Sequence, residues 1–538
     1  MNRERLYLFD TTLRDGAQTS GVDFSLEDKR AIAAALDDLG VDYIEGGWPG
    51  ANPTDSAFFG EKPHLKHAKF TAFGMTKRAG RSVANDPGLA AILNAQSDAC
   101  CLVGKAWDFH VDVALGVERS ENVISIHESI TAVVHKGKEA LFDAEHFFDG
   151  YKANPNYALE CIKAAHDAGA RWIVLCDTNG GSMPEEVERI VREVTKTIPG
   201  TKLGIHAHND TEQAVAVSLA AVRGGARQIQ GTLNGLGERC GNANLVSLIP
   251  TLLLKPDYAE RYEIGISCES LKTLRRTAHL LDEILNRSPN RHAPYVGESA
   301  FAHKGGLHVS AVQKDPRTYE HVPPETVGNR RRILVSDQAG RSNVIARLHE
   351  AGIAFREDDP KLQRLLDEVK DREFLGYSYD GAEASFELLA RRMLGSVPEF
   401  FSVDSFRVSI EQKHDATGAL RTVSEATVKL KIGGKTMINT AEGHGPVDAL
   451  DAALRKDLGA LGKYIDDLQL VDFKVRILTS GAGAGTSAIT RVLVESKDNQ
   501  GARWFTVGVS ENIIEASFEA LRDSIIYKLL RDKAPLPR

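Results

Sequence analysis

Eight short β-rich runs alternate with helical patterns between residue 6 and about residue 254, and this alternation limits the possible folds most strongly. Repeated βα units of this kind are typical of parallel sheets. Eight units in roughly 250 residues match a (β/α)₈ TIM barrel in number and length. An open doubly wound sheet is the alternative, but the first βα turn has no GxGxxG pattern. We expect strands at Leu6–Asp10, Asp42–Gly47, Lys69–Met75, Ala99–Lys105, Glu139–Glu145, Trp172–Asp177, Leu203–His208 and Gln228–Asn234.

The clearest helix between these strands is predicted over Ser25–Leu39. Ser25 is a typical N-cap residue, and Asp28 follows it three positions later. Gly40 then provides a stop, because glycine adopts the left-handed conformation that often ends a helix. These signals support helices as the connections of the barrel.

The chain changes character twice after the barrel, which gives a prediction of three domains. Residues 1–265 are predicted to form the catalytic barrel, and residues 266–400 a mostly helical, charged linker region. Alternating β-rich segments return after Pro398, so residues 401–538 are predicted to be a separate α+β module. The glycine-rich run at 480–487 is equally compatible with a loop that approaches a ligand and with a flexible loop.

The C-terminal module contains a weak internal repeat with a constant offset of 514 − 447 = 67 residues. A duplicated unit indicates that the copies pack on each other or on a second subunit. The matching positions are Val447, Ala449, Ala453 and Leu454 in the first half, and Ile514, Ala516, Ala520 and Leu521 in the second.

Composition and charge exclude several classes of protein. The 538 residues include 66 Lys and Arg against 74 Asp and Glu, a net charge of −8, so we expect no nucleic-acid partner. No strongly apolar run approaches the roughly 20 residues of a membrane-spanning helix, so we expect no membrane partner. The N-terminus has no apolar signal segment and the six cysteines form no CxxC pair, which together predict a cytoplasmic protein.

Polar residues follow the predicted strands where a TIM barrel carries its functional side chains, at the carboxyl ends. His206 and His208 are two positions apart on the seventh strand, so both imidazoles face the same side. With Asp15, and with Asn242 beyond the eighth strand, they could hold a divalent ion such as Mg, Mn, Co or Zn in an open site. The alternative is that the two histidines are merely packed. Other polar residues at this rim are Arg14, Glu45, Glu145 and Thr178.

Four segments resemble the signature segments of the family of isopropylmalate, homocitrate and citramalate synthases. They are DTTLRDGAQ (10–18), IHAHND (205–210), GLGERCGNANL (235–245) and FAHKGGLHVSAVQKDPRTYEH (301–321). EGGWPGANPTD (45–55) and DAEHFFDGYKANP (143–155) resemble the citramalate branch, which condenses pyruvate with acetyl-CoA. The C-terminal module resembles the amino-acid-binding regulatory domain of that family.

The resemblance implies roles for the residues of the barrel. A metal on Asp15, His206, His208 and Asn242 would polarise the carbonyl of a 2-oxo acid. Arg14 would stabilise the oxyanion, although it could instead only form a salt bridge with Glu45 or Glu238. Thr178 would bind the substrate carboxylate, although it could instead cap a helix. Gln18 and Glu45 are expected to contribute to the substrate site.

The resemblance also places catalytic residues outside the barrel. His308 and Tyr319 of the linker region are expected to reach over the barrel of a partner subunit and to join Glu145 there, which requires a homodimer. His308 is the expected general base. His303 is the alternative for this role.

The leading hypothesis from the sequence is an acyltransferase that makes (R)-citramalate and CoA from acetyl-CoA and pyruvate for isoleucine biosynthesis. Feedback by isoleucine is expected ahead of feedback by leucine. The alternative is the same chemistry on 2-oxoisovalerate, as in leucine biosynthesis; Ala17, where many isopropylmalate synthases have Glu, weakens it. A retro-aldol lyase would not need the linker pair or the regulatory module. An inactive amino-acid sensor would not need the complete ligand set.

Overall fold

The computed structural model describes residues 3–334, 341–356, 358–395, 397–414, 420–478 and 488–537. The chain divides into two compact units. Unit 1 comprises residues 1–301 and 321–331, and unit 2 comprises residues 302–320 and 332–538. The predicted linker region, 266–400, therefore contributes to both units, and the division into three domains stays a prediction.

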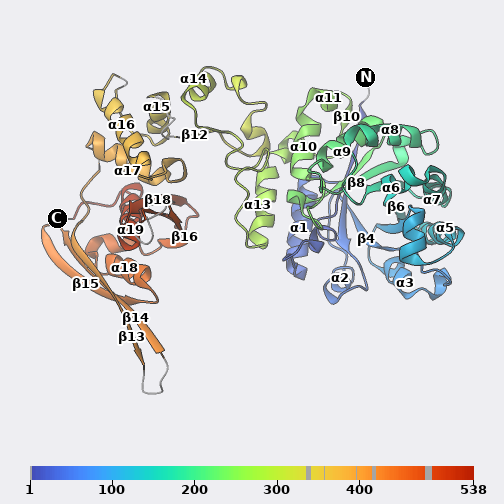
Figure 1. The fold of residues 1–538 in the computed structure, drawn as a ribbon, viewed down its shortest axis with the longest axis horizontal. Helices are drawn as coiled ribbons and strands as arrows, with labels where there is room; N and C mark the ends of the chain where they lie inside the picture. The colour runs from blue at the N-terminus through green and yellow to red at the C-terminus, as the bar shows by residue number, and fades with distance from the viewer. Residues whose placement is uncertain are drawn as a thin grey trace. The chain divides into compact units, whose positions relative to one another are not determined.

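Unit 1 is built on a closed barrel of eight parallel strands that follow one another in chain order (Figure 1). The predicted (β/α)₈ barrel is confirmed. The last strand ends three residues earlier than predicted, because Asn234 has a φ of 56° in the turn that follows. The strands are β2 (Tyr7–Asp10), β3 (Tyr43–Gly47), β4 (Lys69–Met75), β5 (Ala99–Lys105), β6 (Glu139–Glu145), β7 (Trp172–Asp177), β8 (Leu203–Ala207) and β9 (Gln228–Gly231).

Helices surround the barrel, and the first of them follows the predicted signals. Ser25 accepts a hydrogen bond from the backbone N–H of Asp28 and forms a capping box with it, and Gly40 ends the helix at a φ of 102°. The helices of unit 1 are α1 (Leu26–Leu39), α2 (Pro53–Phe58), α3 (Pro87–Asn94), α4 (Asp108–His110), α5 (Arg119–His135), α6 (Phe147–Ala153), α7 (Pro155–Asp167), α8 (Pro184–Val194), α9 (Ala214–Gly224), α10 (Leu245–Leu254), α11 (Pro256–Ala259), α12 (Cys268–Leu271) and α13 (Leu274–Ile284). The short strands β1 (Glu4–Arg5) and β10 (Tyr262–Glu263) pair beside the barrel.

Aromatic side chains fill the amino-terminal part of the barrel. The rings of Tyr7 and Trp172 meet edge to face with centroids 5.1 Å apart, and Trp172 Nε1 donates to the Tyr43 hydroxyl at 3.0 Å. Phe9 stacks on Tyr43 in the same buried cluster. Because this end is packed with apolar groups, polar side chains inside the barrel collect toward the carboxyl ends of the strands.

Unit 2 has a mostly helical first part, followed by two copies of one motif. The first part contains β11 (Ala302–His303) paired with β12 (Arg332–Ile333), and α14 (Gly306–Lys314), α15 (Arg341–Glu350), α16 (Pro360–Phe374) and α17 (Glu383–Leu394). Each copy of the motif is an antiparallel three-stranded sheet followed by a helix. The copies are β13 (Ser402–His414), β14 (Leu420–Ile432), β15 (Lys435–Gly443) and α18 (Pro446–Arg455), then β16 (Gln469–Ile477), β17 (Thr490–Lys497), β18 (Arg503–Ser510) and α19 (Ile513–Arg531).

The internal repeat predicted from the sequence is confirmed by this motif. Val447 and Ile514 are each the second residue of their helix, so the offset of the sequence repeat aligns α18 with α19. Ala449 and Ala516, which are also equivalent, are both fully buried. The glycine-rich run at 480–487 lies outside the described residues.

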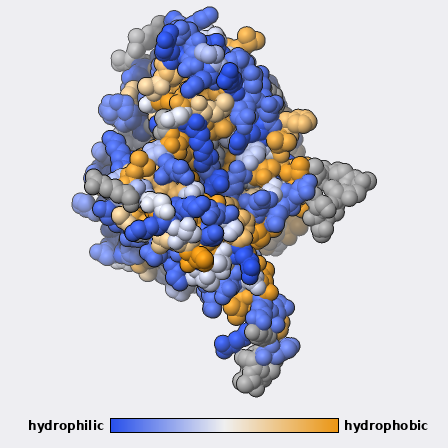
Figure 2. Space-filling model, turned by 90° about the vertical axis from the view of Figure 1, so that its left-hand side faces the viewer, coloured by the Kyte–Doolittle hydropathy of each residue, from blue (hydrophilic) through white to orange (hydrophobic). Residues whose placement is uncertain are grey.

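The β-hairpin of β13 and β14 projects from unit 2, and apolar side chains are visible along it in Figure 2. Ile410 and Leu420 on these strands are 58% and 56% exposed, and Ile438 on the neighbouring β15 is 67% exposed. Within the described segments, no helix has the length and apolar character needed to cross a membrane.

Candidate active site

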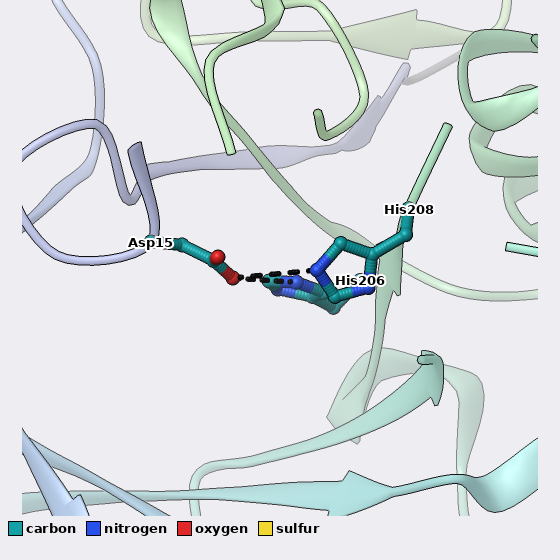
Figure 3. A group of neighbouring side chains, drawn as sticks. All are labelled: Asp15, His206 and His208. Carbon is teal, nitrogen blue, oxygen red and sulfur yellow. Dashed lines mark ion pairs between the residues drawn. The ribbon is translucent and has the colours of Figure 1, made fainter. Parts of the chain in front are cut away.

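Asp15, His206 and His208 form a buried group at the carboxyl end of the barrel (Figure 3). His206 lies on β8, and His208 is the first residue after this strand. Asp15 comes from the turn after β2. Asp15 Oδ2 lies 3.2 Å from His206 Nε2 and 3.7 Å from His208 Nε2. The two imidazoles therefore face one carboxylate oxygen, as the spacing on the strand predicts.

The charges around Asp15 favour its ionised form. Burial alone would raise the pKa of Asp15, but the Arg14 guanidinium and hydrogen bonds from His206 and His208 hold this pKa well below its usual range. For His206, burial lowers the pKa, but the hydrogen bond to Asp15 and the charge of Asp15 outweigh burial, and the net pKa is raised. The carboxylate is thus available as a ligand near neutral pH.

Asn242 lies beside Asp15 and His206, and the contacts of its amide group show whether these residues could hold a cation. Its Nδ2 lies 3.2 Å from Asp15 Oδ2 and 3.1 Å from His206 Nε2, so an amide donor occupies the position between the two ligand atoms. Its Oδ1 is buried and has no hydrogen-bond partner among the described residues. Two imidazole nitrogens, a carboxylate and an amide oxygen suit a divalent metal ion. The donor set therefore fits the predicted metal site when the Asn242 amide is turned over, so that the unpaired Oδ1 takes the place of Nδ2.

Arg14 is held beside this group by two carboxylates and an aromatic ring. Its Nε lies 2.8 Å from Glu45 Oε2, its Nη1 lies 3.1 Å from Asp15 Oδ2, and its guanidinium carbon lies 3.9 Å from the centre of the Phe73 ring. Of the two salt bridges predicted as alternatives for Arg14, the one with Glu45 is formed. Glu238, the other predicted partner, forms an ion pair with Arg239. A cavity of about 470 Å³ is lined by Arg14, the exposed Gln18 and Phe73.

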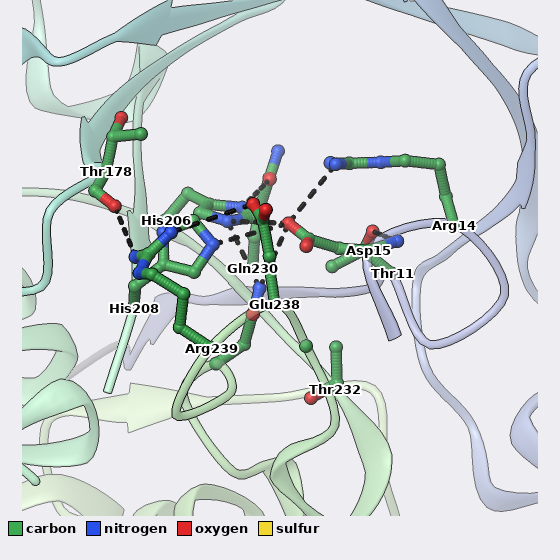
Figure 4. A network of polar contacts seen from close by, with 12 residues as sticks. Thr11, Arg14, Asp15, Thr178, His206, His208, Gln230, Thr232, Glu238 and Arg239 are labelled. Atoms are coloured by element: carbon green, nitrogen blue, oxygen red, sulfur yellow. Dashed lines mark hydrogen bonds and ion pairs between the residues drawn. The ribbon is translucent and has the colours of Figure 1, made fainter. Parts of the chain in front are cut away.

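Thr178 lies after β7, and its side chain does not cap the next helix. That helix, α8, begins at Pro184 with Met183 at the N-cap position. Thr178 Oγ1 instead accepts a hydrogen bond from the backbone N–H of His146 at 2.8 Å, which leaves its hydroxyl hydrogen to be donated elsewhere. Arg239 donates to the Thr178 carbonyl oxygen at 2.8 Å (Figure 4).

Glu145, at the end of β6, belongs to a second group of potential ligands together with His110 and His146. The two imidazole rings have centroids 4.2 Å apart, and Glu145 forms an ion pair with Lys105. Sequence reasoning predicted Glu145 but missed the other three residues. The positive φ of His146, 56°, is a signal that only the structure provides.

His308 and Tyr319 lie in unit 2 and contact each other. Their rings stack with centroids 4.1 Å apart, His308 is exposed, and Tyr319 is 49% exposed. His303, the alternative base, is instead buried with its Nε2 3.1 Å from Glu320 Oε1. The geometry therefore favours His308 as the more accessible imidazole.

Two further polar residues inside the barrel, Asp143 on β6 and Gln230 on β9, were missed by sequence reasoning. Gln230 Oε1 lies 2.8 Å from His206 Nδ1, and Gln230 Nε2 donates to Asp143 Oδ1 at 3.1 Å. Both residues lie on buried strands, where a polar side chain facing the barrel interior is a signal that alternation could have provided.

Comparison with known proteins decides the family. An HMGL-like family model matches residues 5–277, a homocitrate synthase post-HMGL domain-like model matches 295–373, and a LeuA allosteric (dimerisation) domain model matches 380–529. The (R)-citramalate synthase of Aquifex aeolicus is 51% identical, over 98% of this chain and 99% of that protein. The chain belongs to the citramalate synthase family.

Other relatives agree with this assignment. The (R)-citramalate synthase of Geobacter sulfurreducens is 52% identical over 97% of both chains. A probable 2-isopropylmalate synthase of Methanopyrus kandleri is only 34% identical, over 96% of this chain and 97% of that protein. The predicted resemblance to the citramalate branch is therefore confirmed.

Proposed function

We propose that the protein is an acyltransferase that condenses acetyl-CoA with pyruvate to give (R)-citramalate and CoA. The observation that carries this proposal is the buried group of Asp15, His206 and His208 beside Arg14, at the carboxyl end of the barrel. Membership of the citramalate synthase family supports pyruvate as the 2-oxo acid. The reaction belongs to isoleucine biosynthesis.

The barrel residues bind the 2-oxo acid and make its carbonyl carbon electrophilic. A divalent cation held by Asp15, His206, His208 and Asn242, such as Mg, Mn, Co or Zn, would supply Lewis-acid polarisation of that carbonyl. Arg14 donates hydrogen bonds to the oxyanion that develops as the carbonyl is attacked. The Thr178 hydroxyl donates to the substrate carboxylate.

Gln18 and Glu45 have different parts in the substrate site. Gln18 contributes to the wall of the cavity beside Arg14. Glu45 accepts from the Thr11 hydroxyl at 2.6 Å and from Arg14 at 2.8 Å, so it aims the guanidinium. Burial raises the pKa of Glu45, and the Arg14 charge opposes that shift.

A second set of residues deprotonates the methyl group of acetyl-CoA. We assign the general base to His308, because its imidazole is exposed whereas that of His303 is buried against Glu320. Tyr319 orients His308 by ring stacking, and Glu145 joins them from the barrel of the partner subunit. The enolate then attacks the carbonyl carbon of pyruvate, and water cleaves the thioester to release CoA.

The assignment of these residues to two subunits makes the protein a homodimer. The match to a LeuA dimerisation domain and the exposed apolar residues of β13, β14 and β15 support this state. The same module senses a branched-chain amino acid, with isoleucine expected ahead of leucine as the effector. All six cysteines lie in described segments and are free thiols, which supports a cytoplasmic location.

CoA release from acetyl-CoA, measured with a divalent metal present, tests this function. Pyruvate, 2-oxoisovalerate and 2-oxoglutarate are compared as partners, each with and without isoleucine or leucine. We expect a strong preference for pyruvate and inhibition by isoleucine. Preference for 2-oxoisovalerate would mean that the same residues catalyse isopropylmalate synthesis. No CoA release with any partner would contradict the proposed reaction.

A further inference from the structure

We propose that Gln230 and Asp143 are positioning residues that keep a hydrogen on His206 Nδ1, so that Nε2, which faces Asp15, is the nitrogen that gives up its proton to bind the cation. This inference rests on the metal site of the proposed function and extends it to residues that touch neither substrate nor cation. The three side chains form a chain of hydrogen bonds from the barrel interior to the site.

The chain is continuous and shielded from water. Asp143 Oδ1 accepts from Gln230 Nε2 at 3.1 Å, and Gln230 Oε1 lies 2.8 Å from His206 Nδ1. His206 Nε2, the other ring nitrogen, lies 3.2 Å from Asp15 Oδ2. Asp143, Gln230 and His206 are 2%, 1% and 4% exposed, so solvent does not compete for these contacts.

The chemistry of the amide determines the direction of each hydrogen bond. Asp143 Oδ1 accepts from the NH₂ end of the Gln230 amide, and Cys101 also donates to this carboxyl group; burial raises the pKa of Asp143, and these hydrogen bonds oppose that shift. The carbonyl end of Gln230 then faces His206 and can only accept, which requires a hydrogen on Nδ1. A neutral imidazole protonated on Nδ1 carries its lone pair on Nε2, the atom that faces Asp15. Contacts of this kind orient ligand histidines and raise metal affinity.

Gln228 provides a matched control on the same strand. It lies two residues before Gln230 on β9, so both side chains face the same side, and it is fully buried. Neither of its amide atoms has a hydrogen-bond partner among the described residues. Replacing Gln228 therefore changes a buried glutamine of the barrel without changing the contact to His206.

The experiment titrates metal-free protein with Mn²⁺ and measures the dissociation constant by calorimetry. In Gln230→Met, which has similar volume but no hydrogen bonds, we expect the Kd to rise about 10–100-fold. In Gln228→Met we expect the wild-type Kd. In Gln230→Glu, whose carboxylate still accepts from Nδ1–H, we expect tighter binding than in Gln230→Met. The thermal unfolding temperature of each metal-free variant shows whether it is folded.

The possible outcomes separate the inference from the proposed function. If the wild type binds no Mn²⁺, the metal site itself is wrong. If the wild type binds Mn²⁺ and Gln230→Met binds it equally tightly, or if Gln228→Met is weakened as much as Gln230→Met, the positioning role is wrong. If Gln230→Met does not fold, Asp143→Asn provides the test. The new amide at position 143 could present either its oxygen or its NH₂ group to Gln230, so Gln230 would no longer be held in one orientation, and we expect weaker Mn²⁺ binding. An unchanged Kd in Asp143→Asn would overturn the inference.

Discussion

Two groups of side chains at the carboxyl end of one barrel offer the same ligands in different surroundings. Asp15, His206 and His208 form one, and Glu145, His110 and His146 form the other. In each group, the ligand atoms lie within 4.8 Å of one another. In the first, one carboxylate oxygen serves both imidazoles and all three residues are buried, whereas in the second Glu145 is ion-paired with Lys105 and His110 is only half-buried.

The balance of charge explains why only the first group is proposed as a metal site. Arg14 is the cation beside that group, but it is attracted by Asp15, Glu45 and Asp143, so carboxylates outnumber the guanidinium. In the second group, Lys105 already neutralises Glu145. Burial and the nearby charges of His146 and Lys105 lower the pKa of His110. The two groups offer the same kinds of ligand, so neighbouring cations, and not the number of ligands, are what distinguish the proposed metal site from the second group.

Replacing His208 by Ala should give the largest effect. Removing one of two imidazoles from a buried site should abolish divalent metal binding and nearly all turnover, because His208 is one of the two nitrogen ligands that face Asp15. Metal content after dialysis and CoA release measure both effects. The matched control is His110→Ala, which should retain the metal; normal activity in His208→Ala would contradict the site.

Replacing Arg14 by Ala should reduce kcat by about 10²–10³-fold, as expected for loss of one oxyanion donor. The metal should remain bound, because Arg14 is not a ligand. Measurement of kcat alongside Mn²⁺ stoichiometry separates the two roles. Loss of metal together with activity would show that Arg14 acts by holding Asp15.

Replacing Lys105 by Met should make the second group resemble the first, because it removes the cation paired with Glu145. Glu145, His110 and His146 would then be available to a metal, and we expect Mn²⁺ stoichiometry to rise from about one to about two per chain, with weaker binding at the new site. Calorimetric titration at high metal concentration detects it. An unchanged stoichiometry would mean that charge is not what separates the groups.

Lowering the pH should weaken metal binding at the first group by up to about tenfold per pH unit below the pKa of His206. Asp15 raises the pKa of His206, so the protonated imidazole is favoured in the metal-free protein, and its contribution to stability is lost as pH rises through that pKa. Metal binding should therefore release a proton. Calorimetry in buffers of different ionisation enthalpy measures this release, and a pH-independent Kd would contradict it.

The sequence predicts the barrel well because its signals are local. Strand alternation, the Ser25 cap and Gly40 each depend on a few neighbouring residues, and the structure confirms them. The ends of strands are less accurate: Gln228–Asn234 was predicted as one strand, but Asn234 enters a turn that packs against α13 through hydrogen bonds to Ala278 and Asp282. Contacts with distant residues decide such ends.

In the candidate site too, features set by neighbouring residues could be predicted from the sequence, and contacts between distant residues could not. The pair His206 and His208 could be predicted because their spacing on a strand alone puts both imidazoles on one side. Alternation along their strands could have placed Gln230 and Asp143 inside the barrel, but not their contact with each other, because it joins residues 87 positions apart in the chain. Lys105, whose ion pair distinguishes the second group from the first, also meets Glu145 only through the pairing of β5 with β6.

Anomalous diffraction from crystals soaked in Mn²⁺ tests the central claim most directly. The account predicts one strong peak per chain, within bonding distance of Asp15, His206 and His208, with no comparable peak beside Glu145. A peak between His110, Glu145 and His146, or no peak in the barrel at a concentration that supports turnover, would contradict it.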